Sequence, residues 1–262
     1  MVTVAGPELG FTWWGHASVT VELGHVRVAT DPLLSDRLFH LRRYATTPDS
    51  RAYDADVVLL SHLHHDHCHL PSLRGFLPDV PIVVPRGGER YLARLGPRSV
   101  VPASPGDDLD LGGIRIAVLP ATHDGRRHAW SRGLSPPALG FRVVGGGRSF
   151  WFPGDSELRD DMNSIDPVDL ALVPIGGWGP TLADGHMHPE AGADAVARVG
   201  ADWAVPVHWG TFWPRGLRQL ARENHRRLFT SPGERFVKAM ARDGVGVKAW
   251  LAEQGERVVL VP

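Results

Sequence analysis

The sequence predicts an α/β protein in which β-sheets pack against each other and helices cover the outside. The 262-residue chain is 43% hydrophobic, so it can bury a substantial core. Short β-rich segments occur in clusters with helical segments at intervals, and this pattern favours packed sheets over strict β-α alternation. The composition does not shift along the chain, and no strong internal repeat is present. We therefore expect a single domain over residues 1–262.

The first half of the chain is expected to consist mainly of strands. The Gly24-His25 pair between two of them is typical of a hairpin turn. Residues 33–54 show no regular pattern. Because loops longer than about 12–15 residues are usually functional or disordered, we interpret this segment as a loop over an active-site mouth. The expected strands are Phe11–Trp14, Ser18–Leu23, Val26–Ala29, Val57–Leu60, Pro81–Pro85 and Gly113–Leu119, and the expected helices are Leu70–Phe76 and Glu89–Leu95.

The second half mixes strands with two longer helices. Pro189-Glu190 opens one helix, since proline suits the first helical position and an acid complements the helix dipole there. The segment Ser231–Glu234 fits a capping box at the start of the other helix. The expected strands are Leu139–Val144, Ser149–Phe152, Asp169–Ile175, Trp203–Val207, Val245–Leu251 and Arg257–Val261, and the helices run to about Val199 and Arg242.

Charge and composition argue against several classes of protein. The formal net charge is -1, so no global field favours nucleic acid. The single cysteine, Cys68, rules out an intrachain disulfide. No window reaches the roughly 18 uninterrupted apolar residues of a spanning helix, and residues 1–8 lack the features of a signal peptide. We expect a cytoplasmic protein without stable membrane insertion.

The segment from Ser61 to His69 carries five histidines and one aspartate. It follows a predicted buried strand, which can end in a tight turn that points several side chains at one spot. Imidazole and carboxylate are good ligands for zinc and similar divalent ions. His62 and His64 can face one way in extended backbone, while Asp66 and His67, past the bend, can face a second position. One loop could thus serve two metals. A solvated histidine-rich turn is the alternative, which the preceding strand and the ligand candidates downstream disfavour.

Three more potential ligands follow later strands, namely His123, Asp155 and His208. In layered α/β folds, binding sites usually lie at the edge where strands end and loops begin. We therefore expect these three residues to lie close to the histidine-rich turn. We expect one set of His62, His64 and His123, and a second of Asp66, His67 and His208. Asp155, with two oxygens, would bridge both. Each of the three has an alternative interpretation. His123 could be an ordinary loop histidine, Asp155 could belong to a plain turn or cap a helix, and His208 could be a core histidine. His65 and His69 are left outside the sets, and Cys68 is expected to be a packed residue.

These residues resemble the metallo-β-lactamase superfamily, whose hallmark His-x-His-x-Asp-His motif matches His62 to His67. The resemblance covers nearly the whole chain. It is strongest to the branch of the ascorbate-6-phosphate lactonases and N-acyl-phosphatidylethanolamine phospholipases D. The segments that carry this likeness are Trp14–Ala17, Thr30–Pro32, Gly185–Glu190 and His208–Phe212. The resemblance implies an αβ/βα four-layer sandwich with two divalent ions between the sheets. Residues 126–130 are like the phospholipase branch, but the long N-terminal and membrane-docking parts of the animal enzymes have no counterpart, which disfavours a membrane-lipid substrate.

The resemblance implies a metal-dependent hydrolase in which two cations share a hydroxide. Zinc is the default metal, and Mn²⁺ or Fe²⁺ tolerate the same donors. We expect a small-molecule substrate, either a phosphodiester or a lactone or other ester. Asp66 would orient or deprotonate the nucleophile, and His186 is the candidate leaving-group acid, its alternative being a loop histidine before a helix cap. The weaker candidates for substrate contact are Trp178, Arg42, Arg43 and Trp13, although aromatic residues here are more often core.

Two other functions compete with hydrolysis. A di-iron oxidoreductase is disfavoured, because the related flavo-di-iron pattern has glutamate where His64 stands. A non-catalytic metal-binding or scaffold protein would use the same ligands without turnover. Within the hydrolases, classical β-lactamase activity is disfavoured, because the second-site cysteine of several such enzymes has no match in this sequence. Thioesterase and nuclease activities are disfavoured because those members of the superfamily carry added domains. A homo-oligomer is compatible with the sequence.

Overall fold

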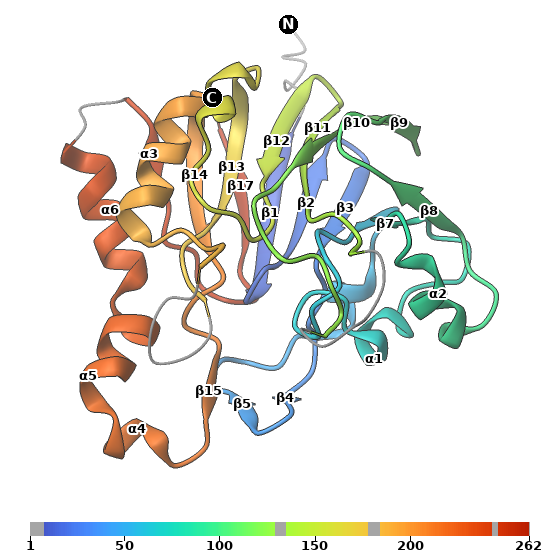
Figure 1. Cartoon of the computed structure of the whole chain (residues 1–262). Helices are drawn as coiled ribbons and strands as arrows, with labels where there is room; N and C mark the ends of the chain where they lie inside the picture. Colours follow the sequence, from blue (N-terminus) through green and yellow to red (C-terminus); the bar gives the residue numbers. More distant parts are fainter. Residues whose placement is uncertain (1–7, 129–134, 178–183, 243–245, 262) are drawn as a thin grey trace, which may run out of the picture.

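Two mixed seven-stranded sheets lie face to face at the centre of the molecule, and helices cover both outer faces (Figure 1). The computed structural model describes residues 8–128, 135–177, 184–242 and 246–261. The α/β architecture predicted from the sequence, with packed sheets inside and helices outside, is confirmed.

The first sheet has the strand order β17-β1-β2-β3-β6-β7-β8. Strands β1 to β3 form an antiparallel meander, and Leu23 pairs with Val26 across the predicted Gly24-His25 turn. From β3 onward the strands run parallel, through β6 and β7 to β8. Its strands are β1 (Leu9–Gly15), β2 (Ser18–Leu23), β3 (Val26–Thr30), β6 (Val57–Leu59), β7 (Ile82–Pro85), β8 (Val100–Ala103) and β17 (Arg257–Leu260).

The second sheet has the order β16-β14-β13-β12-β11-β10-β9. Its strands β9 to β12 are antiparallel, while β12, β13, β14 and β16 are parallel. The strands are β9 (Asp108–Leu111), β10 (Ile114–Pro120), β11 (Leu139–Gly145), β12 (Arg148–Phe152), β13 (Val168–Pro174), β14 (Ala201–Val207) and β16 (Lys248–Ala249).

Three apolar clusters hold four layers together. Successive residues of a strand face opposite sides of the sheet, and β13 shows this clearly. Leu170 and Leu172 pack between the two sheets, whereas Ala171 and Val173 pack under helices α3 (Pro189–Val199) and α6 (Pro232–Arg242). A third cluster joins the first sheet to the short helices α1 (Leu70–Leu73) and α2 (Glu89–Leu92), the latter continued by the 3₁₀ turn η2 (Ala93–Leu95).

The prediction that residues 33–54 form an irregular loop was wrong in part. The segment contains β4 (Arg37–Leu38), β5 (Leu41–Arg43) and the 3₁₀ turn η1 (Ser50–Tyr53). Strand β5 pairs with β15 (Phe212–Pro214), which is distant in the sequence, to make a three-stranded sheet at the lower edge of the molecule in Figure 1. Local patterns cannot reveal a strand whose partner lies so far along the chain.

Other differences concern short elements. Strands β8 and β9 were missed, and so were α4 (Leu217–Leu220), α5 (Arg222–His225) and the π-helical turn η4 (Arg226–Thr230). In the predicted strand from Val245 to Leu251, only Lys248–Ala249 forms a strand among the described residues. A 3₁₀ turn, η3 (Asp160–Ser164), precedes β13. No helix in the described ranges is both long and apolar enough to cross a membrane.

The core between the sheets gives a direct test of this architecture. Phe141 on β11 is fully buried there. We expect Phe141→Ala to lower the free energy of unfolding by about 3–5 kcal/mol, because it removes buried apolar surface and leaves a cavity. Chemical denaturation measures this loss. Leu77→Ala, at a side chain that is 67% exposed, is the control and should change stability by less than about 0.5 kcal/mol. Equal effects of the two substitutions would contradict the assignment of the core.

Candidate metal centre

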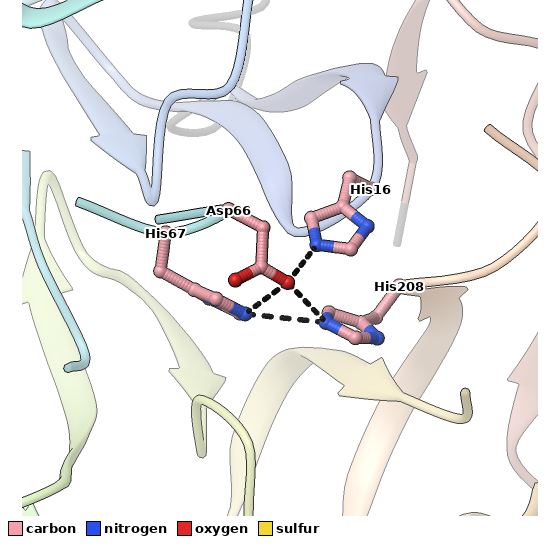
Figure 2. A group of neighbouring side chains, drawn as sticks. All are labelled: His16, Asp66, His67 and His208. Carbon is pink, nitrogen blue, oxygen red and sulfur yellow. Dashed lines mark hydrogen bonds and ion pairs between the residues drawn. The ribbon is translucent and has the colours of Figure 1, made fainter. Parts of the chain in front are cut away.

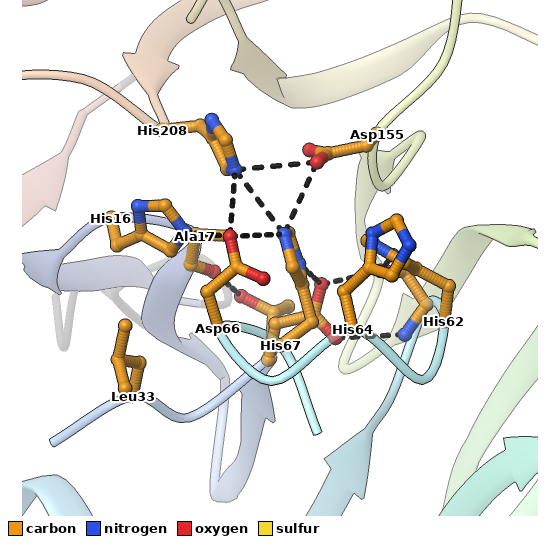
Figure 3. Close-up of polar contacts among 12 residues, drawn as sticks. His16, Ala17, Leu33, His62, His64, Asp66, His67, Asp155 and His208 are labelled. Atoms are coloured by element: carbon orange, nitrogen blue, oxygen red, sulfur yellow. Dashed lines mark hydrogen bonds and ion pairs between the residues drawn. The ribbon is translucent and has the colours of Figure 1, made fainter. Parts of the chain in front are cut away.

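The predicted ligands come together at one edge of the two sheets, where strands pass into loops. His62, His64, Asp66 and His67 lie in the loop after β6, and His123, Asp155 and His208 follow β10, β12 and β14. Figure 3 shows the side chains of the histidine-rich loop, Asp155 and His208 pointing toward a common centre. The convergence expected from the strand endings is therefore present in the fold.

The first cluster consists of three imidazoles. His62 Nε2 lies 2.9 Å from His64 Nδ1, and His123 Nε2 lies 3.2 Å from the same His64 atom. Ligand nitrogens at about 2.0–2.1 Å from a tetrahedral zinc ion would be about 3.3 Å apart. The cluster thus has the spacing and the donor atoms of a three-histidine metal site.

The second cluster combines Asp66, His67 and His208 with His16, as Figure 2 shows. Asp66 Oδ2 lies 3.0 Å from His16 Nε2 and 3.6 Å from His67 Nε2. The Nε2 atoms of His67 and His208 are 3.2 Å apart. All four residues are buried. His16 was not among the predicted ligands, although the turn that contains it belongs to one of the segments that carried the family resemblance.

Asp155 lies between the two clusters. Its Oδ2 is 3.1 Å from His67 Nε2 and 3.3 Å from His208 Nε2, on the side of the second cluster. The same carboxylate also groups with His123 and His186, and His186 Nε2 lies 3.3 Å from Oδ2. Its other oxygen, Oδ1, is buried without a hydrogen-bond partner among the described residues. An orphaned buried carboxylate oxygen is costly unless a cation or donor satisfies it, which fits a bridging metal ligand.

Asp31 connects the two clusters from behind. Its carboxylate is fully buried and accepts hydrogen bonds from the Ser61 backbone N–H (2.7 Å), the Ser61 hydroxyl (2.5 Å) and His67 Nδ1 (2.7 Å). The Ser61 hydroxyl in turn lies 2.9 Å from His62 Nδ1. Because Nδ1 of His67 donates to Asp31, its Nε2 keeps a lone pair for a metal. One carboxylate therefore orients a histidine of each cluster.

His123 is oriented by backbone instead. Its Nδ1 donates to the Gly185 carbonyl at 2.9 Å, which leaves Nε2 as the acceptor that faces His64. Gly185 has φ +82°, and a Cβ there would lie only 2.6 Å from His123 Nδ1. Gly154 has φ +61° and would similarly meet Ser61 Cβ at 2.5 Å. These two glycines let the loops after β12 and before α3 approach the ligands closely.

Burial and charge set protonation states that suit metal binding. Burial, together with the neighbouring His67, holds the pKa of His62 well below its usual value, and burial likewise lowers the pKa of His123 to about 4. Burial opposes ionisation of Asp155, but the positive potential of His208 and His67 outweighs it and keeps its pKa well below the ordinary range. His67 is the exception. Burial lowers its pKa, but Asp155, Asp66 and Asp31 together raise it well above normal. The clustered carboxylates thus favour positive charge at this point, as expected of a cation site.

The backbone is strained at the second cluster. Of the four non-glycine residues with positive φ in the described part of the chain, three are His16 (52°), Asp31 (33°) and His208 (64°). Such conformations cost free energy and concentrate at functional sites. Here the His208 N–H donates to the His16 carbonyl at 2.8 Å, and the Thr211 hydroxyl accepts from the His16 N–H at 2.7 Å. These bonds hold the two strained histidines side by side.

Arg127 fixes the histidine-rich loop from outside. It is buried, and its Nη1 donates to the carbonyls of Leu63 (3.1 Å) and Cys68, which flank the ligands from His64 to His67. Its Nη2 donates to His65 Nδ1 at 2.8 Å. The sequence analysis assigned no role to Arg127. A guanidinium that holds both ends of the loop limits the movement of the ligands between them.

Two of the four candidate substrate contacts make structural interactions. The Arg43 guanidinium donates to the carbonyls of Ser35, Trp14 and Leu33, so it braces the chain rather than facing a substrate. Trp13 is buried, donates to the His16 carbonyl and stacks on Trp209, and is therefore a core residue. Arg42 is half-buried on β5, opposite Trp213 of β15. Trp178 lies outside the described residues.

The neighbouring polar residues mostly serve the local structure. His69 caps α1, where its Nδ1 accepts from Ser72 N, and Cys68 is a buried free thiol, as predicted. Burial raises the pKa of Cys68 to about 11. The residues that the sequence analysis missed in the site are His16, Asp31, Ser61 and Arg127. Two of these stand in the segments that carried the resemblance, but nothing in the local pattern says that they lie near a metal.

The fold and the site define a class: an α/β sandwich protein with a histidine- and aspartate-rich metal centre at the edge of its two sheets. The family model of the β-lactamase superfamily domain matches residues 26–209. The chain belongs to this superfamily, in the branch that contains the UPF0173 proteins and the N-acyl-phosphatidylethanolamine-hydrolyzing phospholipases D.

Relatives and solved structures agree with this placement. N-acyl-phosphatidylethanolamine-hydrolyzing phospholipase D 1 of Caenorhabditis elegans is 28% identical over 83% of this chain and 68% of its own length. A UPF0173 metal-dependent hydrolase of Methanopyrus kandleri is 29% identical over 94% of this chain and 97% of its own length. An uncharacterised Mycobacterium tuberculosis protein is 30% identical over 78% of this chain, which spans only 59% of that relative. The fold matches a metallo hydrolase of Ignicoccus hospitalis with a TM-score of 0.72 at 21% identity, over 97% and 99% of the two chains.

The bridging position of Asp31 can be tested by an isosteric change. Asp31→Asn places an amide N–H₂ where the Ser61 hydroxyl and His67 Nδ1 need an acceptor. His67 then loses its orientation directly, and His62 loses it through Ser61. We expect zinc affinity, measured by competition with a chromogenic chelator, to fall about 10–100-fold. Asp36→Asn, at an exposed carboxylate, is the matched control and should bind zinc as the wild type does. Unchanged affinity in a folded Asp31→Asn protein would contradict the orienting role.

Arg127 and its neighbour Arg126 form a second matched pair. Arg127→Met keeps the apolar stem but removes the donors to Leu63 and Cys68, whereas Arg126 bonds to the half-buried Asp124. We expect Arg127→Met to lower the melting temperature and to speed zinc release, since each lost charged hydrogen bond is worth about 1.5–3 kcal/mol. Arg126→Met should have little effect on either quantity. Thermal unfolding and stopped-flow chelation measure the two effects, and equal behaviour of the two variants would rule out the loop-fixing role.

Proposed function

We propose that this protein is a metal-dependent hydrolase that holds two divalent cations, with zinc as the expected metal. The observation that carries the proposal is the position of Asp155, which lies between a three-imidazole cluster and a cluster built on Asp66, His67 and His208. A shared carboxylate between two such sets is the usual arrangement for a pair of metal ions. Zinc suits the neutral imidazoles and ionised carboxylates, and Mn²⁺ or Fe²⁺ accept the same donors.

In this proposal each residue has a defined task. His62, His64 and His123 would hold the first cation, Asp66, His67 and His208 would hold the second, and the Asp155 carboxylate would serve both. Bound cations supply activation of water near neutral pH and neutralise charge that develops on the substrate. The Asp66 carboxylate also accepts a hydrogen bond from His16 Nε2 at 3.0 Å, and in this proposal it orients or deprotonates the attacking water.

His186 is proposed as the proton donor to the leaving group. It groups with His123 and Asp155, and its ring centroid lies 4.8 Å from that of His123. Asp155, 3.3 Å from Nε2, would stabilise its protonated form. This position, beside the ligands, is the one that a general acid needs.

The proposed substrates are small molecules with a phosphodiester, or with a lactone or other ester. The name of the worm relative describes hydrolysis of a phospholipid, and that of the archaeal relative a metal-dependent hydrolase. These names support hydrolysis, and we propose phosphodiesters as the first substrates to try. We further propose action in the cytoplasm, without nucleic acid as a partner.

Metal removal and one substitution test the proposal together. Exhaustive chelation should abolish turnover on a panel of phosphodiester, lactone and ester substrates, and added Zn²⁺ should restore it. Asp66→Asn should lower kcat at least about 100-fold, the usual scale for loss of general acid–base catalysis. Asp161→Asn, whose carboxylate is half-exposed and pairs with Arg159, is the control. Full activity in chelated protein would refute a metal-dependent reaction.

A further inference from the structure

A cavity of about 380 Å³ opens beside the second cluster. It lies between β15, the helical segment α4 to η4, and the turn between β4 and β5. Its walls are mostly aromatic and aliphatic, formed by Leu41, Trp209, Phe212, Trp213, Leu217 and Phe229, among others. Small-molecule sites typically have volumes of about 300–1,000 Å³ and apolar walls of this kind.

The cavity is continuous with the candidate metal centre. His16 and His208, both members of the second cluster, line it together with Gly177. The ring centroids of these two histidines are 4.0 Å apart, so they form one surface at the inner end of the cavity. A molecule whose reacting group lay at Asp66 and Asp155 would therefore project its next atoms toward these apolar walls.

The cavity walls carry few polar groups. His40 and Asn224 are among the lining residues, and the indole N–H of Trp213 is buried without a hydrogen-bond partner among the described residues. Other polar groups are already hydrogen-bonded. The Thr211 hydroxyl accepts from the His16 N–H and donates to the Trp209 carbonyl. The Trp209 indole N–H donates to the Pro206 carbonyl at 3.0 Å. No lysine, arginine, aspartate or glutamate lines the cavity among the described residues. The walls thus favour an apolar group over a charged one.

The turn between β4 and β5 marks the outer wall. Its residue His40 lines the cavity, while the adjacent Phe39 lies edge-on to His65 of the histidine-rich loop, with ring centroids 5.0 Å apart. Phe39 is 72% exposed and has φ 51°, the fourth strained non-glycine residue of the described chain. The strained turn thus places His40 against the cavity and Phe39 against the histidine-rich loop.

We propose that this cavity binds the non-reacting, apolar part of the substrate, a small hydrocarbon group. The inference rests on the proposed function, since it names the substrate class for that same centre. The size follows from the volume: about 380 Å³ lies near the lower end of the range of small-molecule sites, about 300–1,000 Å³. A short alkyl chain or one to two rings fits, and a complete pair of long acyl chains does not.

Two substitutions on the same helix separate this role from general effects. Leu217 on α4 lines the cavity and is 43% exposed, whereas Leu220 on the same helix is 83% exposed and lies outside it. Leu217→Asp therefore places a charge at the cavity wall, and Leu220→Asp places the same charge on the surface. Neither position is part of the core, so both variants are expected to fold.

The kinetic test uses p-nitrophenyl alkyl phosphates and p-nitrophenyl alkanoates whose alkyl groups range from methyl to hexyl. Water replaces nitrophenolate in each, so only the apolar group changes. In the wild type, kcat/KM in the series that is turned over should rise about fourfold for each methylene that enters the cavity. Leu217→Asp should reduce the hexyl-to-methyl ratio at least about tenfold, and Leu220→Asp should leave it unchanged. A ratio near one in the wild type would overturn the inference while leaving hydrolysis intact.

If neither series is hydrolysed, that result counts against the proposed function. A binding measurement then tests the inference about the cavity without turnover. The two-ring fluorescent dye 5-dimethylaminonaphthalene-1-sulfonate, added to zinc-loaded protein, should bind at about one site per chain, and hexyl phosphate should displace it better than inorganic phosphate does. Leu217→Asp should weaken dye binding about tenfold, and Leu220→Asp should not. Equal dye affinity in the two variants, or no binding to the wild type, would overturn the inference whatever the activity.

Discussion

The site depends on one buried carboxylate. Asp31 has no exposed surface, and its two oxygens receive three hydrogen bonds from Ser61 and His67. An unpaired charge at this depth would be prohibitive, so the donors and the acceptor require each other. These bonds affect both clusters. The Ser61 hydroxyl also contacts Nδ1 of His62, which belongs to the first cluster, and His67 itself belongs to the second. Asp31 therefore sets the direction of two histidines in two clusters at once, before any metal enters.

The layers of the fold make that constraint rigid. Asp31 follows β3 and Ser61 follows β6, and these strands are parallel neighbours in the first sheet. The Asp31 N–H also donates to the Leu59 carbonyl at 2.9 Å, which extends the ladder to the site itself. Close-packed apolar clusters on both faces of each sheet prevent the strands from shifting. The positive φ angles at His16, Asp31 and His208 persist because this framework over-determines them.

The sequence predicted the parts of the molecule that rest on local patterns. Strands such as β11 to β13 were found by their apolar alternation, and the ligands His123, Asp155 and His208 by their position after such strands. What it missed depends on partners far along the chain. β5 is a strand because β15 pairs with it, and Arg127 matters because two carbonyls of another loop face it. The carbonyls that Arg43 binds and the stacking of Trp13 on Trp209 likewise involve other segments of the chain.

The surroundings of the two clusters differ, and this asymmetry bears on how a substrate could lie. On the first cluster, His64 and His123 are half-buried beside polar neighbours such as Asp124 and His186. On the second, His16 and His208 are buried and form the inner end of an apolar cavity. Under the proposed function, water and a polar leaving group would be stabilised on the first side, and hydrocarbon on the second. A substrate with one polar and one apolar end would therefore be held in a single direction, with its reacting centre near Asp155. Orientation of this kind is itself a source of rate enhancement, because it removes unproductive poses.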